Sequence, residues 1–157
     1  MTAGLVVSQG DPEFIVPGSD AWRMLVTPSK VAAMLGESRY ESPFRLWHRM
    51  KGILPPEPPK DAFDIGHDVE PFAANRWRRL NPGWRISKGE VQFHVPDGHF
   101  PFPALGTIDR RCSRGWWRKI AEFKLARTLS DAEAWGDPNL SGDCPSDYAC
   151  QIVTQMA

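Results

Sequence analysis

Apolar residues recur at helical spacing in two short segments near the start of the chain, and each segment has its own start and stop signals. A capping residue followed by proline opens them, at Thr27-Pro28 and at Ser42-Pro43. Glycine closes them, at Gly36 and Gly52, because it adopts the left-handed conformation without a steric penalty. The pattern therefore predicts two helices, whereas residues 1–20 show no clear period and are expected to be weakly ordered.

Two more helices are expected further along the chain. Apolar side chains recur at helical spacing over residues 62–80, and Asn81-Pro82-Gly83 stops that helix. The proline-rich run at residues 54–59 cannot be helical and is expected to form a stiff, extended linker. The last helix is expected to begin near Pro145 and to include Gln155.

Between the third and fourth helices the hydrophobic period becomes that of strands, with turn signals at residues 96–98 and 113–115. The expected strands span residues 84–87, 90–95, 104–110 and 116–125. Helices, then a meander of strands, then a helix predict an α+β (mixed α/β) fold with a central mixed sheet flanked by helices. The length favours one domain, over residues 21–157.

Composition narrows the class of protein. Hydrophobic residues make up 41% of the 157 residues and charged residues 24%, which is typical of a globular domain with a real core. No stretch approaches the roughly 18 apolar residues of a membrane span, and the start lacks the basic region of a signal peptide. We therefore expect a cytoplasmic protein without a membrane. The three cysteines lack the number and spacing of a zinc site or an iron–sulfur cluster.

The charge is zero in total but uneven along the chain. Residues 110–127 hold seven basic residues and one acidic residue, a net charge of +6, whereas residues 128–157 hold five acidic residues and no basic one. Basic surface beside acidic surface suits an enzyme that acts on polyanions, because one surface grips phosphates while the other holds cations. The two blocks can also be solvated surfaces whose charges merely cancel, and composition alone favours this simpler interpretation.

Three residues on neighbouring strands suggest chemistry. Asp109 ends one strand-like run, and Glu122-Phe123-Lys124 lies inside the next expected strand. Because strand side chains alternate, Glu122 and Lys124 should share one face while Phe123 enters the core. A hairpin through residues 113–115 would bring Asp109 close to Glu122, and paired carboxylates favour a hard ion such as Mg²⁺ or Mn²⁺.

Such an ion polarises a phosphoryl oxygen, and Lys124 can orient a water or stabilise charge in the transition state. A plain salt bridge between Glu122 and Lys124 explains the same spacing, and these residues alone favour it. Glu70, in the helix that precedes the sheet, adds a third acid and strengthens the case for a site. Trp116-Trp117 could stack on bases, but we favour packing of one ring on each strand face.

Six short motifs also occur in the order of a known family. They are Thr27-Pro28-Ser29 with Leu35-Gly36, Ser42-Pro43 with Leu46-Trp47 and Lys51-Gly52, Gly66 with Glu70-Pro71, Gly106-Thr107-Ile108-Asp109, Glu122-Phe123-Lys124, and the tail Trp135, Tyr148, Gln151. With these motifs the chain resembles the YqaJ-like viral recombinases, or lambda-type exonucleases, of the PD-(D/E)XK nuclease superfamily. The resemblance implies a restriction-endonuclease-like core and an Mg²⁺-dependent deoxyribonuclease, a 5′→3′ exonuclease on duplex DNA in phage or prophage recombination.

The resemblance implies a role for each residue of the site. Asp109 and Glu122 would be the principal metal ligands, with the backbone carbonyl of Phe123, and Glu70 would complete a second metal position or hold its water. Lys124 would be the catalytic lysine. The superfamily's name expects proline before the aspartate, where this chain has isoleucine.

The resemblance also implies substrate contacts. Ser29 would hold a DNA phosphate, which suits its place at a helix N-terminus, where free N–H groups attract anions. Gln151 would support the lysine or a substrate phosphate, with Tyr148 near it. Arg23 matches the family's phosphate-binding arginine, although the segment between it and Ser29 is shorter than usual.

Partners and alternatives follow from the same family. The resemblance implies double-stranded DNA, a single-strand annealing protein and a ring-shaped homo-oligomer, and a C-terminal part of the fold that is missing here. A restriction-like or structure-specific endonuclease with the same core stays open, and would cut closed circular DNA. A truncated, non-catalytic DNA-binding domain also stays open, and would bind DNA with steep salt dependence but cut none.

Overall fold

The computed structural model describes residues 4–56, 58, 61–126, 128–136 and 144–157. These residues divide into two compact units. The first unit contains Met1–Phe14, Glu57–Pro96 and Thr107–Leu125, and the second contains Ile15–Pro56, Asp97–Gly106 and Ala126–Ala157. Each unit is therefore assembled from segments that are far apart in the sequence, and each is described separately.

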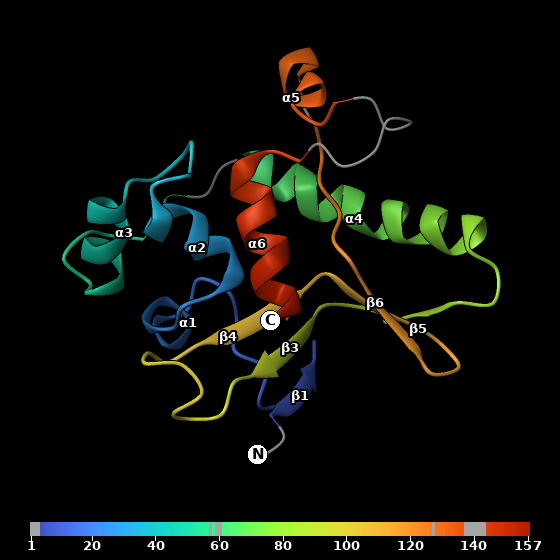
Figure 1. Ribbon diagram of the computed structural model, residues 1–157, viewed down its shortest axis with the longest axis horizontal. Helices are drawn as coiled ribbons and strands as arrows, with labels where there is room; N and C mark the ends of the chain where they lie inside the picture. The colour runs from blue at the N-terminus through green and yellow to red at the C-terminus, as the bar shows by residue number, and fades with distance from the viewer. Residues whose placement is uncertain (1–3, 57, 59–60, 127, 137–143) are drawn as a thin grey trace. The chain divides into compact units, whose positions relative to one another are not determined.

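The first unit holds one long helix and most of the strands (Figure 1). Its helix is α4 (Asp61–Leu80), and its strands are β1 (Leu5–Ser8), β2 (Arg85–Ile86), β3 (Val91–His94), β5 (Arg110–Arg114) and β6 (Trp117–Ala121). The strand β4 (Leu105–Ile108) enters this unit with its last two residues. One sheet has the order β1-β3-β4 and the other the order β2-β5-β6.

Strand register explains the core of the first unit. β1 pairs antiparallel with β3, which sets Val7 opposite Gln92, and both side chains are buried. β5 pairs antiparallel with β2 and with β6, and its central residue Cys112 is fully buried. Ile108, at the end of β4, is 2% exposed. The strands of the two sheets therefore contribute the buried side chains of a small core.

The second unit is mostly helical. It contains α1 (Asp20–Met24), α2 (Pro28–Leu35), α3 (Pro43–Met50), α5 (Leu129–Glu133) and α6 (Ser146–Met156). α2 packs against both α3 and α6, and its buried alanines, Ala32 and Ala33, allow close approach (Figure 1). Leu105 is the most buried aliphatic residue of this unit, and its N–H donates to the carbonyl of Val26 at 3.0 Å.

The α+β fold class and the four expected helices are confirmed. Gly36 ends α2 with a φ of 80°, and the Ser42 side chain accepts the N–H of Arg45 at the start of α3. The strands form two three-stranded sheets in place of the single central sheet that we expected. β1, α1 and α5 were not expected from the hydrophobic pattern. None of the described helices is both long and apolar enough to cross a membrane.

Two strand predictions need correction. The expected strand at residues 104–110 is interrupted at Asp109, and residue 110 already belongs to β5. The expected strand at residues 116–125 ends at Ala121, so Glu122-Phe123-Lys124 follows the strand and does not lie inside it. The physical reason is a single hydrogen bond: Asp109 Oδ2 accepts the N–H of Phe123 at 2.6 Å, in place of a ladder carbonyl.

The packing predicted for the last strand is also wrong. Phe123 is only half-buried, and Leu125 is 43% exposed, so neither continues a core-facing row. Trp116 and Trp117 were expected to pack on the two faces of the strand, but they are 97% and 70% exposed. They lie at the tip of the β5–β6 hairpin, where the first four residues of β6 are all exposed.

Candidate active site

Asp109 lies where the chain passes from one sheet of the first unit to the other. It is the single residue between β4, of the β1-β3-β4 sheet, and β5, of the β2-β5-β6 sheet. The last pair of the β5–β6 ladder joins Arg110 to Ala121. The next positions along the two strands are Asp109 and Glu122, so the register brings the expected pair of acids close together.

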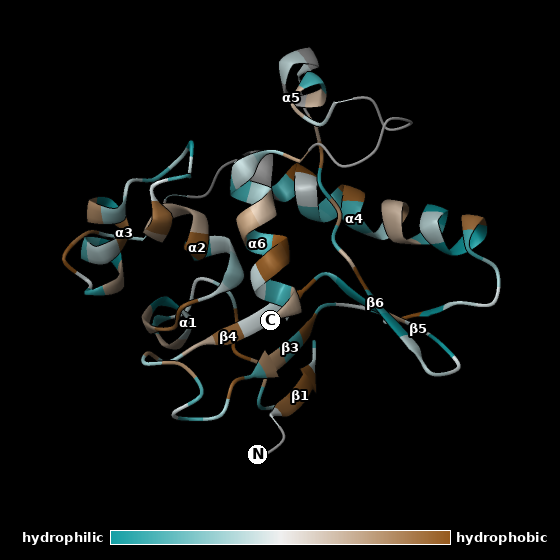
Figure 2. Ribbon diagram, in the orientation of Figure 1, coloured by the Kyte–Doolittle hydropathy of each residue, from teal (hydrophilic) through white to brown (hydrophobic). Residues whose placement is uncertain are grey.

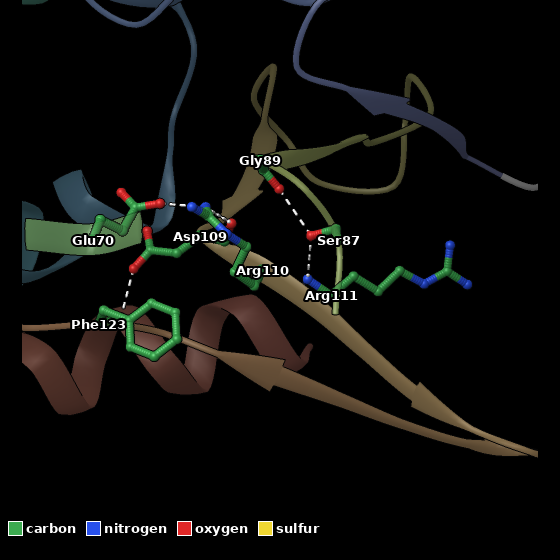
Figure 3. Close-up of polar contacts among 7 residues, drawn as sticks. All are labelled: Glu70, Ser87, Gly89, Asp109, Arg110, Arg111 and Phe123. Carbon is green, nitrogen blue, oxygen red and sulfur yellow. Dashed lines mark hydrogen bonds and ion pairs between the residues drawn. The ribbon is translucent and has the colours of Figure 1, made fainter. Parts of the chain in front are cut away.

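Three carboxylates gather at this junction. Glu70 from α4, Glu90 from the residue before β3, and Asp109 each offer a ligand oxygen, and these oxygens lie within 4.8 Å of one another. All three residues are half-buried. Figure 3 shows the carboxylates of Glu70 and Asp109 facing the same space, with the peptide of Phe123 on the other side of Asp109.

Arg110 balances part of this negative charge. Its Nη1 pairs with Glu70 and also donates to the carbonyl of Asp109 at 2.6 Å (Figure 3). The side chain of Arg110 is 6% exposed and that of Glu70 is 15% exposed. A buried cation that is paired with one acid of the cluster fixes that acid in place and leaves the others less compensated.

Glu122 and Lys124 form the pair that their spacing predicted. Lys124 Nζ donates to Glu122 Oε1 at 2.6 Å, so the two side chains lie on one side of the chain. The side chain of Glu122 is 8% exposed and that of Lys124 is 25% exposed. Phe123, the residue between them, donates its N–H to Asp109 Oδ2 at 2.6 Å, which places the pair beside the acidic cluster.

The crowding of acids changes their protonation. Burial, and then the charge of Glu122, raise the pKa of Asp109 from its ordinary 3.8 to about 7. Burial, and then the charge of Glu70, raise the pKa of Glu90. The negative charge of the cluster is therefore poorly solvated, and a bound cation would stabilise it.

The donor set fits a hard divalent cation. Carboxylate oxygens are the ligands that Mg²⁺ and Mn²⁺ prefer. Two oxygens that share one ion through bonds of about 2.1 Å lie at most about 4.2 Å apart. The oxygens of Glu70, Glu90 and Asp109 already lie within 4.8 Å, so small side-chain movements suffice. The ligand roles of Glu122 and of the Phe123 carbonyl stay predictions.

Sequence reasoning missed two residues of this site, Glu90 and Arg110. Glu90 is the first residue of an expected strand, but nothing local indicates that this strand lies beside β4. Arg110 belongs to the basic block of residues 110–127, where its charge alone did not separate it from its neighbours. A weak signal existed for Arg110, because it directly follows the candidate ligand Asp109.

Two residues expected to contact substrate lie near the start of the second unit. Ser29 is exposed in the first turn of α2, and its Oγ lies 3.1 Å from the hydroxyl of Thr27. Arg23, in the last turn of α1, pairs with Asp20 at 3.0 Å.

Lys30 fixes this part of the second unit. Its Nζ donates to the carbonyls of Trp22, Arg23 and Leu25 at 2.9, 3.1 and 2.7 Å. The side chain also lies over the Trp22 ring, 3.9 Å from its centroid. Burial lowers the pKa of Lys30 to about 8. This lysine therefore closes the end of α1 and holds the backbone of Arg23 in place.

Tyr148 and Gln151 lie on α6 of the second unit. The Tyr148 ring stacks on Trp135, with centroids 5.3 Å apart, so two members of the expected tail motif do meet. Asp147, at the start of the same helix, pairs with Arg39 at 3.2 Å. Gln151 is half-buried one turn further along α6. The DNA contacts of Ser29, Arg23, Tyr148 and Gln151 stay predictions.

Comparison with known proteins supports the family resemblance. The family model of the YqaJ-like viral recombinase domain matches residues 20–157. Curated proteins and solved structures give no significant match. The family indicates a nuclease of phage-type recombination, and the acidic junction supplies ligands suited to the divalent metal that such nucleases use. With most of its length matched in this way, the chain belongs to the YqaJ-like viral recombinase domain family.

Proposed function

We propose that this chain is an Mg²⁺-dependent deoxyribonuclease that digests linear duplex DNA from its 5′ ends. The observation that carries the proposal is the meeting of Glu70, Glu90 and Asp109 at the junction of two sheets, beside the Glu122–Lys124 pair. Carboxylates at this spacing can hold a divalent metal that assists phosphodiester hydrolysis, and a neighbouring ammonium group can stabilise the charge that develops. The 5′→3′ direction rests on family membership.

Each residue of the junction has a task in this proposal. Asp109, with Glu70 and Glu90, would hold Mg²⁺ or Mn²⁺, and Glu122 and the Phe123 carbonyl would complete the ligand set. When bound, such an ion polarises a phosphoryl oxygen and lowers the pKa of water. The hydrogen bond from Phe123 N–H orients the Asp109 carboxylate, so that its other oxygen faces Glu70.

Lys124 would act on the substrate. Its ammonium group carries three N–H donors, and one of them bonds Glu122. An ammonium group beside the carboxylates can orient the attacking water or stabilise the negative charge that develops on the phosphate. The contact with Glu122 holds the lysine side chain at this end of the junction.

The second unit would supply the remaining DNA contacts. Ser29 and Arg23 are proposed to hold a DNA phosphate, and Gln151, with Tyr148 near it, is proposed to support the lysine or a substrate phosphate. A single-strand annealing protein as partner and a ring-shaped homo-oligomer are proposed from family membership alone.

Digestion of linear and closed circular duplex DNA in Mg²⁺ tests the function. The wild-type chain is expected to digest the linear form and spare the circle, and Glu122→Ala and Lys124→Ala are expected to lose cleavage. Label release should begin at 5′ ends. Cleavage of the circle would instead indicate an endonuclease, and unchanged cleavage by both variants would refute the site.

A further inference from the structure

A second charged region of the first unit is not used by the proposed chemistry. A groove of about 420 Å³ is lined by residues of the β2-β5-β6 sheet and of strands β1 and β3. Three aliphatic side chains form part of its wall, and the polar lining consists of arginines and serines only: Arg85, Arg111, Arg118, Ser8, Ser87 and Ser113. A concave surface with this lining offers many N–H and O–H donors to an anion.

Strand register sets the arginines on one face of the sheet. Arg85 pairs with Ser113 across β2 and β5, and Ser113 pairs with Arg118 across β5 and β6. Directly paired residues project to the same side, with about 5 Å between neighbours. Arg111 is two residues from Ser113 along β5 and therefore shares that side. The paired residues thus form a row of hydrogen-bond donors across the three strands, and the guanidinium of Arg111 lies on the same side.

These guanidinium groups are available to a ligand. No carboxylate lines the groove, and no ion pair joins any of its three arginines to a described residue. Arg118 Nη1 donates to the carbonyls of Gly115 and Trp117 at 2.7 and 2.9 Å, which fixes its position and leaves further N–H donors. Figure 3 shows the side chain of Arg111 extended away from the acidic cluster.

The opposite side of the hairpin is different. Its cations Arg114 and Lys119 lie over the ring of Trp84, at 4.9 and 5.0 Å from the centroid. They are therefore engaged by an aromatic partner within the protein. Figure 2 shows hydrophilic colour along much of β5 and β6, in contrast to the hydrophobic β1.

The tip of the hairpin adds an aromatic group to this basic surface. Trp116 is 97% exposed and directly follows Gly115, whose φ of 56° allows the tight turn. Arg118 Nη1 donates to the carbonyl of Gly115, so this guanidinium lies beside the turn that carries Trp116. Leaving a tryptophan in water costs free energy that stacking on a partner would recover.

We propose that this groove binds the phosphodiester backbone of a single DNA strand and that Trp116 stacks on one of its unpaired bases. Arginine matches phosphate geometry, and a ring at a hairpin tip can stack only on a base whose face is exposed. The inference deepens the proposed function and rests on it, because the strand would belong to the DNA that the nuclease processes. It assigns a substrate-holding role to a surface that the proposed chemistry does not use.

Fluorescence anisotropy in EDTA, where no DNA is cut, tests the proposal on the full chain. The probes are a labelled oligothymidylate and a blunt duplex. The groove variant is Arg85→Gln/Arg111→Gln/Arg118→Gln. The matched control, Arg76→Gln/Arg78→Gln/Arg79→Gln, removes the same charge from α4. A second pair compares Trp116→Ala with Trp47→Ala, which changes an exposed tryptophan of α3.

The groove variant is expected to bind oligothymidylate at least about ten-fold more weakly than the wild-type chain. The slope of log affinity against log salt concentration should become shallower by about 2, while the affinity of the α4 control stays within about two-fold of the wild-type value. Trp116→Ala is expected to weaken oligothymidylate about ten-fold and blunt duplex much less. Equal losses of oligothymidylate affinity in the groove variant and its control would overturn the DNA-binding role of the groove. Equal losses of oligothymidylate and duplex in Trp116→Ala would overturn the single-strand assignment.

The same variants separate this inference from the nuclease proposal. Asp109→Asn is expected to bind oligothymidylate like the wild-type chain, because it leaves the groove intact. A wild-type chain that cuts no DNA in Mg²⁺, with strand binding that depends on the arginines, would refute the nuclease and support the groove. Full cleavage together with unchanged binding by the groove variant would refute the groove alone.

Discussion

The strand β5 carries two charged regions of opposite character. Arg110, at its start, turns inward and pairs with Glu70 beside a half-buried cluster of acids. Arg111, the next residue, turns the other way and lines an exposed groove. Alternation of side chains along a strand is sufficient to produce this contrast. One region therefore concentrates negative charge out of water, and the other presents positive charge to water.

The difference indicates what each region needs. Acids that are crowded and partly desolvated are unstable as anions, which the raised pKa values of Asp109 and Glu90 reflect, and they favour a cation. Exposed arginines cost little to keep charged, and they favour an anion with matching spacing. A metal and a phosphate backbone are the corresponding partners, and a nuclease uses both.

The largest expected effect is on the rate of DNA cleavage, which depends on the acidic junction and its neighbour Lys124. Lys124→Met should reduce the rate on linear duplex DNA by about 10²- to 10⁴-fold, because the water and the developing charge lose their donor. Initial rates at saturating Mg²⁺ measure this. The matched control Lys88→Met removes an exposed lysine of the same unit and should change little. Equal rates in both variants would show that Lys124 has no part in the reaction.

The next effect concerns stability. Arg110→Met should lower the free energy of unfolding by about 3 kcal/mol in EDTA, because Glu70 is left buried and unpaired. Urea denaturation measures the loss, and adding Glu70→Gln should recover part of it. Arg111→Met, its exposed neighbour, should stay within about 0.5 kcal/mol. Similar losses in Arg110→Met and Arg111→Met would remove the contrast between the two faces of β5.

The pH dependence of stability gives a smaller effect with a definite sign. The pKa of Asp109 is about 7 in the folded chain and 3.8 ordinarily, so between these values the folded chain binds more protons than the unfolded chain. Asp109 therefore makes stability without metal fall as pH rises from about 4 to 7. Denaturation midpoints should show this decline in the wild-type chain and a shallower one in Asp109→Asn. Parallel pH profiles would contradict the assignment.

The smallest effect is expected at the hairpin tip. Trp116→Ser should change the free energy of unfolding by no more than about 0.5 kcal/mol, because the ring is 97% exposed. Trp84→Ser should cost more, since Trp84 contacts Trp77 and carries two cations over its ring. Thermal denaturation compares the two variants. A large loss in Trp116→Ser would mean that the ring packs within the protein, as the sequence first suggested.

Local signals in the sequence were sufficient for the helices and for part of the site. Caps, prolines and glycines act over a few residues, so α2 and α3 could be placed closely. The Glu122–Lys124 pair was also predictable, because it depends on a two-residue spacing. Its place after the strand was not predictable, since the strand ends through a hydrogen bond to the distant Asp109.

The rest depends on which strands become neighbours. Glu90 joins the cluster because β3 lies beside β4, and Asp109 directly follows β4. The hydrophobic pattern along a chain does not reveal which strands become neighbours in a sheet. The exposure of Trp116 and Trp117 has the same origin. The pattern identified an apolar strand but could not show that residues 117–120 of this strand stay exposed.

Isothermal titration calorimetry with Mn²⁺ tests the acidic junction most directly. The wild-type chain should bind the ion, Asp109→Asn should bind it at least about ten-fold more weakly, and the triple arginine variant of the groove should bind it as the wild-type chain does. Binding that is unchanged in Asp109→Asn, or absent from the wild-type chain, would contradict the assignment of this junction as a metal centre.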